Sequence, residues 1–367
     1  MNKRALEVLE DQFINERAVC RKRKGKDSKE DLKNNAKKLN LSKNKVLEKD
    51  IDIIPNKALP NSFDGSICVA PQKLPVKKVQ PVRQTVSGSC TANLVFFDVE
   101  TTSLRLFCDI TQIAAVDKNE VFNEYVTPSQ KMNPTASILT GITCDNGILK
   151  VHGRPVEAKS RVVALEKFLK WLELRSPALL FAHKAQFDYT RLFRAIYEEN
   201  LVKQFEKHII GFVDTVQMFK SKYPGLVNYK QKTLVGKFLK KSYEQHNAVE
   251  DAKLLKELYH TTQPHNIADS SCTFMSSYNK WFNDLQCMIK KETFIKMINM
   301  KCVSDGMATK MARLGLTLAD VKSAYEKDSH DGVAALLSQE DENGKPRVTK
   351  HKGVINNIIK YLHKAQV

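Results

Sequence analysis

The sequence lacks any apolar run long enough to cross a bilayer, and its first residues do not resemble a signal peptide. Its eight cysteines are scattered, and no two of them form a C-x-x-C pair. This spacing indicates neither a zinc ribbon nor a disulfide framework. We therefore expect a reduced, intracellular protein.

Acidic residues are also in short supply. The 367 residues include 59 Lys and Arg against 41 Asp and Glu, which gives a net charge of +18 and a pI near 9.4. Such a balance predicts attraction to polyanions, with nucleic acid as the leading candidate and an anionic membrane surface as the alternative. The length suggests two or three domains, and an apolar content of 42% is ample for a core.

Residues 1–91 are predicted to be a basic, largely disordered arm and linker. Residues 1–90 carry 20 Lys and Arg against 11 Asp and Glu, and the prolines after residue 54 follow no period. The run Arg21–Lys26 resembles a nuclear import signal or a phosphate-binding patch, and the alternative is a solvated charge cluster. A nuclear or nucleocytoplasmic location is therefore expected.

A folded domain is predicted over residues 92–262. Strands come first, and strands alternating with helices follow, which favours an α/β fold with a mixed sheet flanked by helices. The wholly apolar run Ala178–Ala182 is typical of a buried parallel strand. The other predicted elements are a strand beginning at Leu94, strands Ile110–Val116, Val121–Val126 and Gly211–Met218, and helices Val162–Arg175 and Phe187–Glu199.

Residues 271–367 are predicted to form a small basic helical domain after a linker at 262–270. Thr317 is a candidate N-cap, and Gly315 is a candidate C-terminal stop for the helix before it. No catalytic constellation is recognisable in this part. The predicted helices are Tyr278–Met300, Ala308–Leu314, Leu318–Lys327, Val333–Ser338 and Val354–Lys364.

Two acids end the first strand. Side chains alternate along a strand, so Asp98 and Glu100 share one face while Phe97 and Val99 point to the other. Two adjacent buried carboxylates repel each other unless a cation lies between them. The pair therefore predicts a metal site, and the alternative is a strand end with two solvated acids.

Further ionisable residues stand where other elements begin. Asp188 ends an Ala-His-x-Ala-x-Phe-Asp string that lies between a strand and a helix. Asn247, followed three residues later by Glu250, resembles a capping box. This box puts Asp251 in the first turn of a helix and His246 just before it, so both side chains can face one spot.

Taken in order over Leu94 to Thr262, these motifs resemble the DEDD exonucleases in their histidine variant, the proofreading-subunit and three-prime repair exonucleases. A looser resemblance, carried by the His246–Ala252 and Met307–Thr317 strings, is to the exonuclease-like region of promyelocytic leukaemia protein and its stand-alone relatives. Ser103 and Lys184 depart from the usual family residues, but neither occupies a ligand position.

The resemblance implies a ribonuclease-H-like fold and 3′→5′ hydrolysis of nucleic acid, DNA rather than RNA. It implies that Asp98, Glu100, Asp188 and Asp251 hold two divalent cations and that His246 is the general base. Oxygen ligands favour Mg²⁺ or Mn²⁺ over zinc. It also implies substrate contacts at Thr101, Leu104 and Ile142; for the last two, the alternative is core packing.

Two alternatives remain at this point. The fold can serve as a nuclear protein-interaction module whose exonuclease site is idle, or the substrate can be RNA, because no residue pattern reports recognition of the 2′-hydroxyl. The complete set of five ionisable residues favours the enzyme. Seven lysines between Asp214 and His246 are candidates for phosphate contacts or simply a solvated face.

Overall fold

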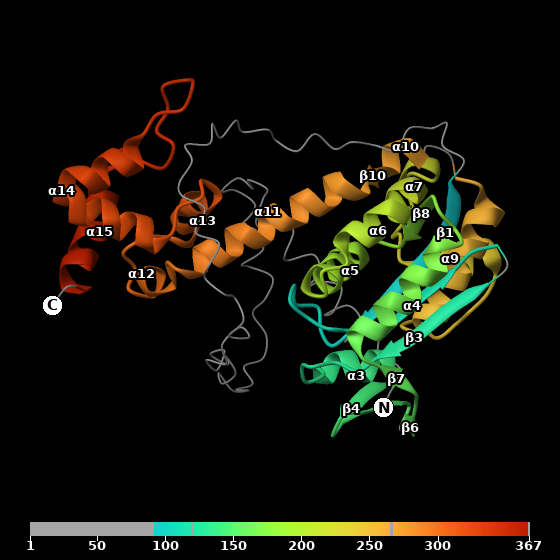
Figure 1. The fold of residues 1–367 in the computed structure, drawn as a ribbon. Helices are drawn as coiled ribbons and strands as arrows, with labels where there is room; N and C mark the ends of the chain where they lie inside the picture. The colour runs from blue at the N-terminus through green and yellow to red at the C-terminus, as the bar shows by residue number, and fades with distance from the viewer. Residues whose placement is uncertain (1–91, 119, 265–266, 366–367) are drawn as a thin grey trace, which may run out of the picture. The chain divides into compact units, whose positions relative to one another are not determined.

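The computed structural model describes residues 92–118, 120–264 and 267–365 (Figure 1). The predicted arm and linker at 1–91, with the basic run Arg21–Lys26, lies outside the described residues. None of the helices in the described ranges is long and apolar enough to span a membrane.

A seven-stranded mixed sheet forms the framework, in the order β10-β9-β8-β1-β2-β3-β7. Strands β1 (Asn93–Thr101), β2 (Ile110–Val116) and β3 (Val121–Val126) form an antiparallel meander. On the other side of β1, strands β8 (Ala178–Ala182) and β9 (Ile209–Asp214) run parallel to it. The predicted ribonuclease-H-like mixed sheet flanked by helices is confirmed.

Both faces of the sheet are covered by helices, and β1 divides its side chains between them. Val95, Phe97 and Val99 enter the main core, to which α4 (Arg161–Glu173), α5 (Gln186–Glu198) and α6 (Val202–His208) contribute. Phe96 enters a second cluster, with residues of α7 (Thr215–Lys222) and α9 (Ala248–Thr262). Asp98 and Glu100 continue the even-numbered series, so they point to the face that α9 covers.

The chain between β3 and α4 contains regular structure, although no helix or strand is predicted there from the sequence. It forms α3 (Pro134–Thr140) and a small antiparallel sheet of three strands. Asn146 and Gly147 both have positive φ at the turn of the first hairpin. The strands are β4 (Ile142–Asp145), β5 (Ile148–Val151) and β6 (Arg154–Pro155), and β7 (Ala158–Lys159) then joins the main sheet.

The predicted strand Gly211–Met218 is wrong in its second half. The strand β9 ends at Asp214, whose side chain accepts a hydrogen bond from the Val216 N–H at 3.1 Å and so caps α7. After α7 come the short helix α8 (Gln231–Leu234) and a π-helical turn, η1 (Val235–Leu239).

The main sheet and its core extend beyond residue 262. Residues in the predicted linker form α10 (Ile267–Ser270), and β10 (Ser271–Thr273) pairs antiparallel with β9. From α11 (Phe274–Glu292), Phe274 and Trp281 enter the main core. The predicted boundary between a domain at 92–262 and another at 271–367 stays a prediction.

The remaining helices have a core of their own. The predicted helix Tyr278–Met300 ends at Glu292, and a separate helix follows. Residues 318–338 form a helix interrupted by non-helical Asp328 and Ser329, between the two helices predicted there, and Thr317 caps it with a complete capping box. The helices are α12 (Ile295–Asn299), α13 (Asp305–Arg313), α14 (Leu318–Ser338) and α15 (Lys352–Ala365).

Candidate active site

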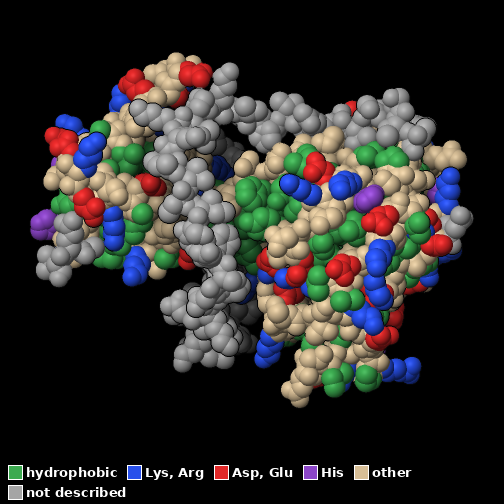
Figure 2. Space-filling view, in the orientation of Figure 1, with side chains coloured by type: hydrophobic (Ala, Val, Ile, Leu, Met, Phe, Trp, Pro, Cys, Tyr) green, Lys and Arg blue, Asp and Glu red, His purple; other side chains and the backbone are tan. Residues whose placement is uncertain are grey.

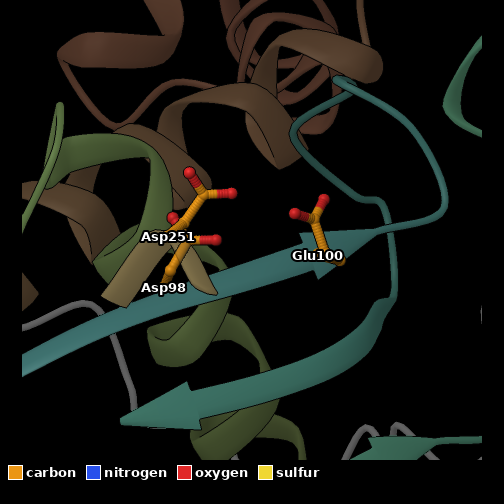
Figure 3. Close-up of side chains that lie close together, drawn as sticks. All are labelled: Asp98, Glu100 and Asp251. Carbon is orange, nitrogen blue, oxygen red and sulfur yellow. The ribbon is translucent and has the colours of Figure 1, made fainter. Parts of the chain in front are cut away.

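Three carboxylates gather at the carboxyl end of β1. Asp98 and Glu100 rise from one face of the strand, and Asp251 approaches from α9 (Figure 3). One ligand oxygen from each lies within 4.8 Å of the other two. Glu100 and Asp251 are buried, with 8% and 9% of their surface exposed. Asp98 is half-buried. So close a group of carboxylates has the spacing and chemistry of a cation site.

Asp251 is held by donors from three places. Its Oδ1 accepts a hydrogen bond from the Tyr243 hydroxyl at 2.7 Å and one from Gln231 Nε2 at 3.3 Å, and its Oδ2 accepts the His246 N–H at 2.8 Å. Burial raises the pKa of Asp251, while the hydrogen bonds from Tyr243 and His246 lower it. Burial, together with the charges of Asp251 and Asp98, raises the pKa of Tyr243. The Tyr243 hydroxyl therefore remains a donor at neutral pH.

The helix α9 begins where the sequence predicts. Asn247 is the N-cap, and its side chain accepts hydrogen bonds from the N–H groups of Val249 and Glu250. Gln112 of β2 also accepts the Ala248 N–H at 3.3 Å, which links the helix start to the sheet. The cap places Asp251 in the first turn of the helix.

His246 precedes this cap in a left-handed backbone conformation, with φ +69°. A non-glycine residue adopts such a conformation at a cost, and strain of this kind is concentrated at functional sites. The charge of a protonated His246 lowers the pKa of Asp251. The imidazole therefore lies within electrostatic reach of the carboxylate cluster.

Asp188 belongs to the first turn of α5, directly after β8, and is 2% exposed. Strands β1 and β8 run parallel, so their carboxyl ends lie at the same edge of the sheet. Asp188 is not one of the three acids within 4.8 Å of one another. The structure thus brings together Asp98, Glu100 and Asp251, and sets Asp188 in the first turn of the helix that follows the adjoining strand.

The predicted substrate contacts differ in exposure. Thr101 is buried, and its hydroxyl donates to the Ser103 carbonyl at 2.8 Å. Leu104 is half-buried in the loop that joins β1 to β2. Ile142 is 1% exposed and packs in a small core with Leu149, as the core-packing alternative expects. A role for these residues in binding stays a prediction.

Several lysines of the segment between Asp214 and His246 have partners within the fold. Lys222 Nζ donates to the Gln263 carbonyl at 2.8 Å, and Lys241 pairs with Glu257 at 2.6 Å. On the face seen in Figure 2, Lys and Arg side chains alternate with Asp and Glu. Lys220 and Lys237 lie over the rings of Tyr229 and Phe238, each 5.8 Å from the ring centroid. Phosphate contacts by these lysines stay a prediction.

The donor set fits a hard divalent cation. Mg²⁺ and Mn²⁺ prefer carboxylate oxygens, and the cluster offers three carboxylates with no cysteine. Sequence reasoning missed Tyr243 and Gln231, the side-chain donors to Asp251. No local pattern marks these two residues, because they meet Asp251 only through the path of the chain around η1.

Comparison with protein families assigns two segments. Residues 95–259, less than half of the chain, match the RNase_T family model, described as Exonuclease. Residues 290–365 match the PML, C-terminal domain model. The first match covers most of the main sheet and the carboxylate cluster, so this segment is similar to the Exonuclease family.

Two curated relatives each match less than half of this chain. A DNA polymerase III PolC-type of Caldanaerobacter subterraneus is 33% identical over 184 residues, which cover 47% of this chain and 12% of that protein. The maternal protein exuperantia of Drosophila virilis is 27% identical over 173 residues, which cover 43% of this chain and 35% of that protein. The chain thus spans about a third or less of the length of these relatives.

Solved structures with some likeness include two nucleases. Exonuclease X in complex with 5′ overhanging duplex DNA is 18% identical, with a TM-score of 0.32 over 48% of this chain and 98% of that one. A 3′-exonuclease with histone mRNA stem-loop is 14% identical, with a TM-score of 0.38 over 47% of this chain and 84% of that one.

Proposed function

We propose that the domain at residues 92–262 is a metal-dependent 3′→5′ exonuclease of the histidine-containing DEDD type that acts on nucleic acid, with DNA as the favoured substrate. The observation that carries the proposal is the close cluster of Asp98, Glu100 and Asp251 at the carboxyl end of β1. The match of residues 95–259 to the exonuclease family model supports it. The basic composition of the chain suits a polyanionic substrate and a nuclear or nucleocytoplasmic location.

Four acids would hold two Mg²⁺ or Mn²⁺ ions: the three clustered carboxylates and Asp188. When bound, such ions stabilise negative charge on the reacting phosphate and favour ionised water at neutral pH. The chain fixes the ligands by distinct means. The strand β1 holds Asp98 and Glu100 on one face, and Tyr243 and the His246 N–H orient Asp251.

His246 would accept the proton of the attacking water at an imidazole nitrogen. A histidine suits this role because its ordinary pKa lies near neutrality. Its position before the N-cap of α9 keeps its backbone hydrogen-bonded to Asp251. One rigid helix start thus carries both the base and a metal ligand, which is the pre-organisation that proton transfer requires.

The substrate end would lie against Thr101 and Leu104, and Ile142, which packs in the small core, would be a third contact. The test is degradation of 5′-labelled DNA and RNA oligonucleotides in Mg²⁺, in Mn²⁺ and in EDTA. Stepwise shortening from the 3′ end in either metal, and none in EDTA, is expected. An intact oligonucleotide under all conditions would favour the idle, protein-interaction alternative.

A further inference from the structure

The loop at residues 103–108, which joins β1 to β2, is tied to the helix that carries Asp188. Arg191 Nη2 donates to the carbonyl oxygens of Leu104 at 2.8 Å and Arg105 at 3.1 Å. Arg191 is 7% exposed and lies three residues after Asp188, so the two residues share one side of α5. The first half of the loop is therefore fixed relative to the candidate site.

The second half of the loop is fixed at Phe107 and at the next residue. Gln130 Nε2 donates to the Phe107 carbonyl at 2.6 Å, and Arg194 Nη1 donates to the Cys108 carbonyl at 3.0 Å. Both donors come from outside the loop. The backbone that carries the Phe107 ring is thus held before any ligand arrives, which lowers the ordering cost of binding.

On this fixed backbone, Phe107 is 44% exposed and its neighbour Arg105 is exposed. A single exposed apolar side chain is ordinary on a protein surface. An exposed aromatic ring beside an exposed cation, on a rigid loop, has the composition of a site for single-stranded nucleic acid. The Arg194 guanidinium carbon lies 5.7 Å from the centroid of the Phe107 ring. The exposed part of the ring offers a flat surface for a base, and the Arg105 cation attracts the phosphate.

The place of the loop suits this ligand. The loop begins three residues after Glu100, and Figure 3 shows it rising on the side of β1 to which the three carboxylates point. A strand whose 3′ end reaches the carboxylates would therefore pass the loop with its next nucleotides.

We propose that Phe107 stacks on a base of a single-stranded 3′ tail, close to the nucleotide being removed, with Arg105 attracting the adjoining phosphate. This inference rests on the proposed function, which gives nucleic acid as the substrate. It goes further by naming an unpaired 3′ tail as the form of the substrate. Stacking is tolerant of base identity, so the expected preference is for single strands rather than for a particular sequence.

Binding without turnover tests the inference. The full chain is titrated in EDTA and at low salt against a 5′-fluorescein single-stranded DNA, and anisotropy gives Kd. Phe107→Ala is expected to raise Kd by about 5- to 100-fold, the usual effect of removing one stacked base partner. Phe107→Trp should bind like the wild type, because it keeps a flat ring.

Two control variants distinguish the loss of a stacking ring from the loss of an exposed apolar side chain in general. Ile148→Ala removes another exposed apolar side chain, 54% exposed on β5, and should leave Kd unchanged. Phe107→Leu keeps apolar bulk and should fold normally, yet should bind nearly as weakly as the alanine variant. For the wild type, an oligonucleotide with one abasic position near the 3′ end should bind with a higher Kd than the intact oligonucleotide. For Phe107→Ala, the two oligonucleotides should have the same Kd.

Equal Kd values for wild type and Phe107→Ala would overturn the inference, even if the protein degrades DNA. No binding of single strands by the wild type would overturn it as well. A Phe107-dependent, abasic-sensitive affinity in a protein that hydrolyses nothing in Mg²⁺ or Mn²⁺ would uphold the stacking site and reject the proposed exonuclease. The two proposals therefore fail in distinguishable ways.

Discussion

Asp98 tests the cluster most directly, because its carboxylate lies close to two others on a buried face. Asp98→Ala should abolish trimming of a 3′ end and should not lower the melting temperature in EDTA, since it relieves repulsion between like charges. Titration calorimetry should show weakened Mg²⁺ or Mn²⁺ binding. Near wild-type trimming by this variant would place the catalytic site elsewhere.

His246→Ala is the matched comparison. It leaves the carboxylates in place, so metal binding measured by calorimetry should be retained. The rate of a single turnover should fall by roughly 10²- to 10⁴-fold, the usual worth of a positioned general base. If this variant loses metal affinity to the same degree as Asp98→Ala, His246 acts on the ligands rather than on water.

Tyr243→Phe removes one hydroxyl and keeps the ring. The hydrogen bond to Asp251 Oδ1 is removed, and the free energy of unfolding should fall by about 1 kcal/mol in denaturant titrations. Metal affinity should also fall, because Asp251 is less firmly oriented, whereas substrate Kd in EDTA should stay constant. Unchanged metal affinity would show that Gln231 and the His246 N–H suffice to hold the carboxylate.

At the scale of single residues, the sequence predicts the position of those site residues whose side-chain direction follows from local periodicity. Alternation along β1 assigns Asp98 and Glu100 to one face and Phe97 to the other, and the two cores bear this out. Tyr243 was not predictable in this way, because its contact with Asp251 depends on the chain path after η1. Its neighbourhood carries no periodic pattern that would fix that path.

At the scale of elements, the N-cap of α9 joins stability to the candidate site. Asn247→Ala removes the acceptor for two N–H groups and should lower the free energy of unfolding by about 1 kcal/mol. Because the cap sits between His246 and Asp251, the rate of 3′ trimming should fall as well.

Thr317→Ala is the control, since Thr317 caps α14 in the C-terminal core through an equivalent bond to Asp320 N–H. It should cost a similar free energy of unfolding in denaturant and leave the trimming rate unchanged. Equal loss of activity in both variants would mean that the cap of α9 acts through global stability alone.

The boundaries of helices and strands agree with the sequence prediction where tertiary packing and the local hydrophobic pattern favour the same element. The apolar run of β8 was predicted to the residue, because burial on both faces leaves a continuous signal. The β4–β5 hairpin was missed although Asn146-Gly147 is a strong turn signal. The end of β9 was not predicted, because the apolar residues Val216 and Met218 continue the strand pattern past Asp214, the residue that caps the following helix.

For the whole molecule, the excess positive charge is uneven along the sequence. Residues 1–90 hold half of the net charge of +18, whereas the face of the described part seen in Figure 2 mixes both signs. We therefore expect the N-terminal segment to contribute about half of the long-range attraction to a polyanion, and the proposed site to make the local contacts.

Deleting residues 1–91 tests this division. Affinity for a single-stranded oligonucleotide in EDTA should fall at low salt. The slope of log K against log salt should flatten by about 0.7 for each phosphate that the shortened chain no longer neutralises. The single-turnover rate at saturating protein should match that of the full chain, because the five candidate site residues are all retained. An unchanged salt slope would contradict the proposed role of the charge, and a shortened chain that fails to fold would contradict the prediction that these residues are a separable arm.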